Sequence, residues 1–414
     1  MIDFLSEFDA ELRELDRKAM ELAAPAMKKA EEISDYNAVK VLNAFRSTAV
    51  GAEHLSGSTG YGYGDIGRDK LDELFARIVG AEDALCREQF MSGTHALTVA
   101  IFGLVRSGTR FLSATGDPYD TLMPVMRGPG SIQDYGAVYS SVPLLPDGSP
   151  DIDGITKAAP EADVVFIQRS HGYDPDRKAL SCTDIERITD AVRKSGSRAD
   201  IIVDNCYGEF CGPDEPLSHG ADLIVGSMIK NPGGAVAPTG GYIAGRKDLV
   251  EKCADRLTAP GTGRELGCWP AGHRDTFIGL SRAPGIVCIA LRTGIYASAL
   301  FGLLGYECNP SYDGERPDIT TVIKLGSEEK LIKFCREVQY NSFVDSAAVP
   351  EPWDMPGYDS RVIMASGSFV LGSSIELSCD APLREPYAVY LQGGTSFACS
   401  RYALLKTAAA IGRK

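Results

Sequence analysis

The sequence predicts an α/β protein, with a large domain built on a mostly parallel sheet and a small C-terminal α/β domain. Two observations lead to this prediction. From residue 69 onward, short runs rich in β-branched residues alternate with amphipathic helical segments. Strands that are joined by helical crossovers form a parallel sheet covered on both faces. The chain of 414 residues is also longer than one small core requires.

The first 54 residues are expected to form a helical segment. Apolar residues at helical spacing predict one helix over residues 3–34 and a second helix over 37–48. A loop rich in glycine and serine follows, and the large domain is expected to extend from residue 55 to 285.

Helices and strands should alternate through this large domain. The helical pattern predicts helices over 69–80 and 95–108, and short apolar runs predict strands at 109–115, 163–170, 200–205 and 222–227. A further helix is expected between the strands at 163–170 and 200–205, where Thr183 and Glu186 have the spacing of a capping box and Gly196 follows the expected helix end.

The small domain is expected over residues 286–414, beginning with a linking helix at about 285–300. The stretches DITTVIKLG, EKLIKFCREVQ, RVIMASGSFV, SSIELSC and SFACSRYALLKTAAAIG are its predicted pieces.

Composition excludes several classes of function. A net charge of −14 and a pI near 4.9 argue against nucleic-acid and anionic-membrane partners. Residues 1–30 are too charged for a signal peptide, and no apolar run is expected to reach the ~20 residues of a membrane span. Eleven scattered cysteines without a C-x-x-C pair indicate reduced thiols in a cytoplasmic protein. Five histidines without ligand spacing predict no metal site.

Lys230 stands in the stretch VGSMIKNPGG, directly after an apolar run that reads as a buried strand. A lysine just past a strand end is most often solvated. Ligands of parallel sheets, however, bind outside the carboxyl ends of the strands. A lysine held in that cleft would be an amine nucleophile.

Three further features are predicted at the same edge of the sheet. Ser92, Gly93 and Thr94 lead into a helix whose first N–H groups and hydroxyls could hold an anion. Asp204 closes the strand IIVDN, where a buried carboxylate calls for a cation. Tyr119 follows another strand and could stack on a ring. Each of them, taken alone, also has a purely structural interpretation.

Together these residues match the requirements of pyridoxal 5′-phosphate. The cofactor needs a phosphate cradle, a carboxylate for its ring nitrogen, an aromatic face and a lysine. Ser227, three residues before Lys230, could donate a further hydrogen bond to the phosphate.

The chain resembles the fold-type I pyridoxal-phosphate enzymes, and within them the methionine γ-lyase-like family, also described as cystathionine β-lyases involved in aluminium resistance. The motifs that carry the resemblance are SGTHAL, GDPYDTL, IQRSHGY, IIVDNCYGEF, GSMIKNPGG, PTGGYIAGR, LTAPGTGRELG and SSIELS…APLREPYAVYLQGG. The resemblance implies the fold-type I transferase fold and a homodimer or homotetramer with shared active sites. It implies that Lys230 is the covalent tether and that Asp204 is the partner of the ring nitrogen.

The resemblance also implies further site residues. Arg384 is expected to bind the substrate carboxylate, because the small domain supplies this arginine in the fold; the rivals are Arg361, Arg282 and Arg264. Gln168 is expected near the cofactor ring, and Arg169, Ser170 and Tyr173 could line the substrate pocket.

A neighbouring subunit is expected to complete the site. Cystathionine lyases reach the neighbour's phosphate with a Tyr-x-Arg motif, and the corresponding loop here reads GYGYGDIGR. Tyr61, Tyr63 and Arg68 are present with a different spacing. Thr258 and Gly261, in TAPGTGRE, are expected to cross the same interface.

The expected activity is that of a carbon–sulfur lyase in amino-acid metabolism. It would act on cystathionine or methionine by β- or γ-elimination and release a thiol, ammonia and a keto acid. Lys230 would remove the Cα proton, with a pKa lowered by desolvation and a nearby cation. An aminotransferase or a non-catalytic relative that binds the cofactor remains an alternative, since fold does not fix function.

Two motif matches are rejected. Residues 62–67 fit G-x-G-x-x-G, but no strand precedes them, as a dinucleotide site requires. Ser227 and Lys230 fit the S-x-x-K motif of serine hydrolases, but the accompanying S-D-N and K-T-G elements are missing.

Overall fold

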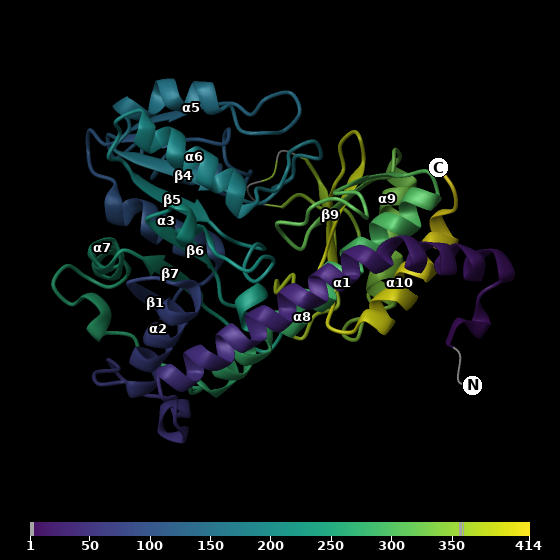
Figure 1. Ribbon diagram of the computed structural model, residues 1–414, viewed down its shortest axis with the longest axis horizontal. Helices are drawn as coiled ribbons and strands as arrows, with labels where there is room; N and C mark the ends of the chain where they lie inside the picture. Colours follow the sequence, from purple (N-terminus) through teal and green to yellow (C-terminus); the bar gives the residue numbers. More distant parts are fainter. Residues whose placement is uncertain (1–3, 356–357, 359) are drawn as a thin grey trace.

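The computed structural model describes residues 4–355, 358 and 360–414. Figure 1 shows a large domain and a small domain joined by two long helices, α1 (Ala10–Ser47) and α8 (Arg274–Leu303), which run side by side across both. The predicted boundary at residues 285–286 lies inside α8.

The large domain is built on a seven-stranded sheet in the order β1-β7-β6-β5-β4-β2-β3. Its strands are β1 (Asp83–Arg87), β2 (Arg110–Ser113), β3 (Val138–Ser141), β4 (Val164–Gln168), β5 (Asp200–Asp204), β6 (Leu223–Ser227) and β7 (Gly241–Gly245). The ladders from β3 through β6 are all parallel. In contrast, β7 is antiparallel to both of its neighbours, β1 and β6. The prediction of a mostly parallel sheet is therefore confirmed.

Helices cover both faces of this sheet, because alternate strand residues point to opposite sides. The helices are α2 (Ile66–Val79), α3 (Gly93–Leu104), α4 (Met123–Met126), α5 (Ile152–Ala158), α6 (Cys182–Lys194) and α7 (Lys247–Leu257). Val164 and Phe166 of β4 pack in one core with α3 and α7. Val165 and Ile167 pack in the other core with α2, α5 and α6.

The small domain contains a five-stranded antiparallel sheet in the order β10-β11-β12-β9-β8. Its strands are β8 (Glu307–Asn309), β9 (Thr321–Lys324), β10 (Val362–Ser366), β11 (Ser378–Pro382) and β12 (Ala388–Gln392), and its helices are α9 (Glu328–Tyr340) and α10 (Phe397–Ile411). In the predicted strand SSIELSC, the first residues form a turn instead. There the Glu376 carboxylate accepts bonds from the Phe369 and Val370 N–H groups.

The N-terminal segment corrects the sequence prediction, since one continuous α1 replaces the two expected helices. Two polar residues near the expected junction of these helices make tertiary hydrogen bonds from inside α1. Ser34 Oγ donates to Pro284 O, and Asn37 Nδ2 donates to the carbonyls of Phe210 and Gly212. The capping box of α6 is also shifted, because Ser181 and Asp184 form it in place of Thr183 and Glu186.

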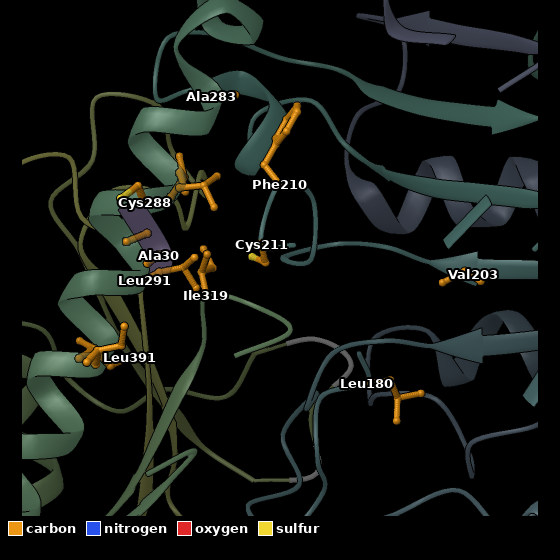
Figure 2. Packing of buried hydrophobic residues seen from close by; sticks show 14 of the residues in the cluster. Ala30, Leu180, Val203, Phe210, Cys211, Ala283, Cys288, Leu291, Ile319 and Leu391 are labelled. Carbon is orange, nitrogen blue, oxygen red and sulfur yellow. The ribbon is translucent and has the colours of Figure 1, made fainter. Parts of the chain in front are cut away.

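Helix α8 is the core helix between the two domains. By length and composition it could cross a membrane, contrary to the expectation from sequence, but 72% of its apolar window is buried in the protein. Figure 2 shows Ala283, Cys288 and Leu291 of α8 beside Ala30 of α1 and Ile319 of the small domain. The shared core thus fixes the small domain against the strand ends of the large domain.

Candidate active site

A cavity of about 330 Å³ lies where the strands β4, β5 and β6 end and the small domain begins. The large domain lines it with Met91, Ser92, Gly93, Thr94, Tyr119, Thr121, Ser170, Gly172, Tyr173, Asp204, Cys206, Tyr207, Ser227, Ile229 and Lys230. The small domain lines it with Thr320, Tyr358, Leu371, Gly372, Asp380 and Gln392. The residues that the sequence placed at this edge are therefore brought together, except for Gln168.

Lys230 follows β6 by three residues, and its amine enters this cavity beside the Tyr207 ring, 3.8 Å from the ring centre. Burial disfavours its charged form, but the neighbouring Cys206, Tyr207 and Asp204 outweigh burial and raise the pKa of Lys230. The expectation of a lowered pKa is therefore wrong for the protein alone. The groups that face the amine are anionic or polarisable acceptors instead of a cation.

Asp204 ends β5, the strand next to β6, and its side chain is buried. The backbone N–H of Cys206 donates to its Oδ1 at 3.1 Å. Burial raises the pKa of Asp204, while Lys230 and Arg177 act in the opposite direction. A buried carboxyl in such surroundings gains from a cationic partner within the cavity.

Tyr207 is a site residue that the sequence analysis missed. Its φ is 73°, in the left-handed region that aromatic residues rarely adopt, so the turn after β5 holds it there at a cost. This turn is fixed because Asn231 Nδ2 donates to Tyr207 O at 2.9 Å. An aromatic residue three positions after a strand-ending aspartate was the available signal.

The N-terminus of α3 forms the end of the cavity near Ser227. Ser92 is the N-cap, and its Oγ accepts the His95 N–H at 3.1 Å, which leaves the O–H of Ser92 able to donate to an anion. Gly93 leaves room that any side chain would fill, because a Cβ there would lie 3.2 Å from Cys206 Sγ and 3.5 Å from Ser227 Cβ. Unpaired N–H groups of a first helical turn suit an anion.

Tyr119 lines the cavity, and Gln168 lies behind it. Gln168 Oε1 accepts the backbone N–H of Tyr119 at 3.0 Å, and its Nε2 donates to Ser170 O at 3.1 Å. Gln168 therefore positions the tyrosine, with its own amide already bonded. Burial raises the pKa of Tyr119 well above its usual range, so its hydroxyl stays neutral.

The small domain contributes an acidic group that the sequence analysis missed. Asp380, in the middle of β11, lines the cavity, and its Oδ2 accepts bonds from Tyr173 Oη at 3.1 Å and Gln392 Nε2 at 3.2 Å. Burial raises the pKa of Asp380, and the Lys230 charge opposes this rise. A lone charged residue inside the otherwise uncharged run LSCDAP was its sequence signal.

The described lining of the cavity includes no arginine. Arg384 lies next to the Tyr173 backbone, where its Nη2 donates to Tyr173 O at 2.9 Å, and its Nη1 is 3.8 Å from Asp120 Oδ2. Arg264 pairs with Asp83. The other predicted arginines lie elsewhere too: Arg361 is 3.8 Å from Glu328, Arg282 is exposed on α8, and Arg169 is buried against Asn205.

The residues expected from a neighbouring subunit lie outside this cavity, on two adjacent loops. Tyr61 and Tyr63 are 73% and 67% exposed, with ring centres 5.9 Å apart. Arg68 is buried and binds the backbone of Gly62 and of the 265–267 loop, so it holds the two loops together. In the second loop, Thr258 Oγ1 donates to Ala254 and Gly263 carbonyls, and Gly261 is exposed.

The cavity residues fit pyridoxal phosphate. The α3 N-terminus with Gly93 offers a place for a phosphate, Asp204 a buried carboxylate, and Lys230 an amine. The cavity volume lies within the range of small-molecule sites. Among the described residues, no cluster of three or more His, Cys, Asp or Glu side chains could hold a metal ion.

Comparison with known proteins agrees with this geometry. The family model of methionine gamma-lyase matches residues 12–412. The uncharacterized protein YnbB of Bacillus subtilis is 41% identical over 392 residues, which cover 92% of this chain and 93% of YnbB.

Two solved structures extend the similarity to three dimensions. A carbon–sulfur lyase involved in aluminum resistance, from Clostridium novyi NT, is 43% identical with a TM-score of 0.93, covering 98% of this chain and 99% of that one. A candidate cystathionine beta-lyase involved in aluminum resistance, from Listeria monocytogenes, is 39% identical with a TM-score of 0.93, covering 96% and 100%. The fold is that of the fold-type I pyridoxal-phosphate enzymes. With its family model matched over nearly the whole length, the chain belongs to the methionine gamma-lyase family.

Proposed function

We propose that this protein is a pyridoxal-phosphate-dependent carbon–sulfur lyase that acts on a sulfur-containing amino acid. One observation carries the proposal: the amine of Lys230, the buried carboxyl of Asp204 and the N-terminus of α3 share one cavity at the strand ends. The family membership supports the same chemistry.

The residues of this chain have distinct roles in the proposed reaction. Pyridoxal phosphate, when bound, supplies an electron sink for the charge that develops at Cα of the substrate. Asp204 holds positive charge on the cofactor ring, and the first turn of α3 with Ser227 binds its phosphate. Tyr119 packs on the ring, positioned by Gln168. The Lys230 amine tethers the cofactor and then takes the Cα proton of the bound substrate.

The proposed overall reaction is an elimination followed by hydrolysis. In the β case, the Cα–H and Cβ–S bonds break, the sulfur leaves as a thiol, and one water converts the remaining amino acid to ammonia and a keto acid. No external oxidant or reductant is needed, because the electrons of the broken C–H bond form the new carbon–carbon double bond.

We also propose a homo-oligomer with shared active sites and a cytoplasmic location. The exposed Tyr61–Tyr63 pair, held by Arg68 beside the 258–267 loop, supports a contact with a second copy. All eleven cysteines are free thiols, which fits a reducing compartment.

The visible spectrum tests the proposed cofactor chemistry. The purified protein with pyridoxal phosphate should be yellow, and borohydride should bleach the band and leave the label on Lys230. Lys230→Ala should lose that covalent label, while Lys194→Ala, at an exposed lysine that pairs with Asp190, should keep it. A protein that stays colourless with added cofactor would contradict the proposal. Cofactor that accumulates in its amine form would indicate an aminotransferase instead.

A further inference from the structure

The small-domain wall of the cavity presents two hydrogen-bond acceptors without matching donors. Both bonds to Asp380 end on Oδ2, and no residue in the described part of the chain donates to Oδ1. Gln392 lies beside Asp380, and its Nε2 donates a hydrogen bond to Asp380. The Oε1 of Gln392 is buried and has no hydrogen-bond partner in the described structure. A buried acceptor such as Gln392 Oε1 is costly unless a ligand satisfies it, while Asp380 is only partly buried and its Oδ1 is left for a ligand.

The position of Asp380 is fixed by its neighbours. Tyr173 donates to it from the loop after β4, and Tyr358 Oη lies 3.2 Å from the Tyr173 hydroxyl. Asp380 pairs with Tyr390 in the register of β11 and β12, and Gln392 ends β12. The carboxylate is thus held by strands of the sheet and not by a loose loop, as a recognition group should be.

The charge of this wall selects the kind of ligand group that it can hold. With arginine missing from the described lining, Asp380 makes the small-domain wall acidic. A carboxylate placed there would meet like charge and acceptors, whereas a protonated amine would donate to both acceptors and neutralise the carboxylate. The opposite wall holds Lys230 and the α3 N-terminus.

We infer that Asp380 and Gln392 bind a protonated amine on the part of the substrate beyond the sulfur. This inference rests on the proposed lyase function and narrows its substrate class. The favoured substrates are thioether amino acids whose leaving group carries an ammonium, as that of cystathionine does. Methionine and S-alkyl cysteines, which end in a methyl group, leave both acceptors unsatisfied.

Two isosteric pairs of ligands test this inference. S-(2-aminoethyl)-L-cysteine and S-propyl-L-cysteine differ only in an ammonium for a methyl group, and both can release a thiol. L-lysine and L-2-aminoheptanoate differ in the same way and have no leaving group, so calorimetry with the cofactor-loaded protein measures their binding alone. We expect a preference of about tenfold or more for the ammonium member of each pair, from one charge-assisted hydrogen bond.

Asp380→Asn should abolish this preference. Asparagine keeps an acceptor for Tyr173 and Gln392, so kcat/KM for the aminoethyl substrate should fall about tenfold more than kcat/KM for S-propyl-L-cysteine, whatever loss the two substrates share. Asp176→Asn, an equal change of net charge at an exposed residue bound to Lys324, should leave the preference intact.

Three results would overturn the inference: no preference in the unchanged protein, an equal loss for both members of a pair in Asp380→Asn, or the same loss in Asp176→Asn. If neither cysteine derivative releases a thiol, the proposed lyase function fails. The binding of lysine against aminoheptanoate still decides the role of Asp380 in that case.

Discussion

The Lys230 amine lies 3.8 Å from the centre of the Tyr207 ring, and Tyr207 is held there with a left-handed backbone. The two residues come from turns that follow neighbouring parallel strands, β5 and β6. Their contact therefore depends on the register of the sheet, in which Asp204 pairs with Val225. Strain at such a turn is typical of a functional site.

Tyr207→Phe should lower the pKa of Lys230, because the Tyr207 hydroxyl is one of the groups that raise it. The pH dependence of Lys230 acylation in cofactor-free protein measures this pKa, since only the neutral amine reacts. The reaction should reach half its maximal rate at a lower pH in the variant. Tyr63→Phe, at an exposed ring outside the cavity, serves as the control. An unchanged midpoint in Tyr207→Phe would show that the hydroxyl does not act on the lysine.

Gly93→Ala should weaken cofactor binding. The new Cβ would lie 3.2 Å from Cys206 Sγ and fill the space at the first turn of α3. Equilibrium dialysis with pyridoxal phosphate should show a loss of affinity of about tenfold or more, which corresponds to the loss of one hydrogen bond to the charged phosphate. Gly285→Ala, in α8 where a Cβ meets nothing within 4 Å, should instead raise stability by roughly 0.5–1 kcal/mol. Cofactor affinity unchanged in Gly93→Ala would place the phosphate elsewhere.

Asp72 and Arg87 form a buried ion pair between α2 and β1, and Arg87 Nη1 lies 2.8 Å from both carboxylate oxygens. Asp72 also accepts the Cys86 N–H at 2.7 Å. Asp72→Ala should therefore lower the free energy of unfolding by roughly 3–5 kcal/mol, because it leaves a buried guanidinium without its partner. Urea unfolding measures the change. The exposed pair of Arg17 and Glu14 offers a control, where Glu14→Ala should cost less than about 1 kcal/mol.

The fold was predictable where one short segment carries its own pattern, as in the strands β2, β4, β5 and β6 and the amphipathic α6. The features that the sequence did not predict depend on contacts with residues that are distant in the sequence. The continuity of α1 through residues 34–37 is one example, because Asn37 is held there by bonds to the carbonyls of Phe210 and Gly212. β7 was not among the predicted strands, and its antiparallel direction follows only from the pairing with β1 and β6.

The same distinction applies to the site. Lys230, Asp204, Tyr119 and the α3 N-terminus follow strands of one parallel sheet, so topology alone brings them together. Asp380 comes from the small domain, and its approach to the cavity depends on how α8 joins the two domains. Arg384 illustrates the reverse case: a family expectation named it, and in this structure it does not line the cavity, because its guanidinium donates to the backbone carbonyl of Tyr173.

Glu209 should give the protein a specific dependence of stability on pH. Burial raises its pKa to about 8, although Tyr242 donates to its Oε1 at 2.7 Å. The folded state therefore binds the proton more tightly than the unfolded chain, whose carboxyl has a pKa of about 4.5. The stabilisation is complete below about pH 4.5 and is lost as pH rises through about 8.

Glu209→Gln removes this titration and keeps an acceptor for Tyr242. Its unfolding free energy should exceed that of the unchanged protein at pH 8 and approach it toward pH 5, with a difference on the order of a few kcal/mol. Urea unfolding across this pH range measures the difference. Glu32→Gln, at an exposed residue of α1, should show no such trend. If the difference in unfolding free energy between Glu209→Gln and the unchanged protein were the same at every pH in this range, Glu209 would have to stay ionised when buried.

Mixing two inactive variants tests whether the active sites are shared between subunits. Lys230→Ala removes the proposed base, and a Tyr61→Ala, Tyr63→Ala double variant removes the exposed aromatic pair proposed to reach the neighbour. If the pair acts in the neighbour's cavity, a hybrid dimer has one site with both changes and one site with neither. Random exchange makes half of the dimers hybrid, so about a quarter of the original activity should return. If the tyrosines serve their own subunit, both sites of a hybrid lack one element, and mixing restores nothing.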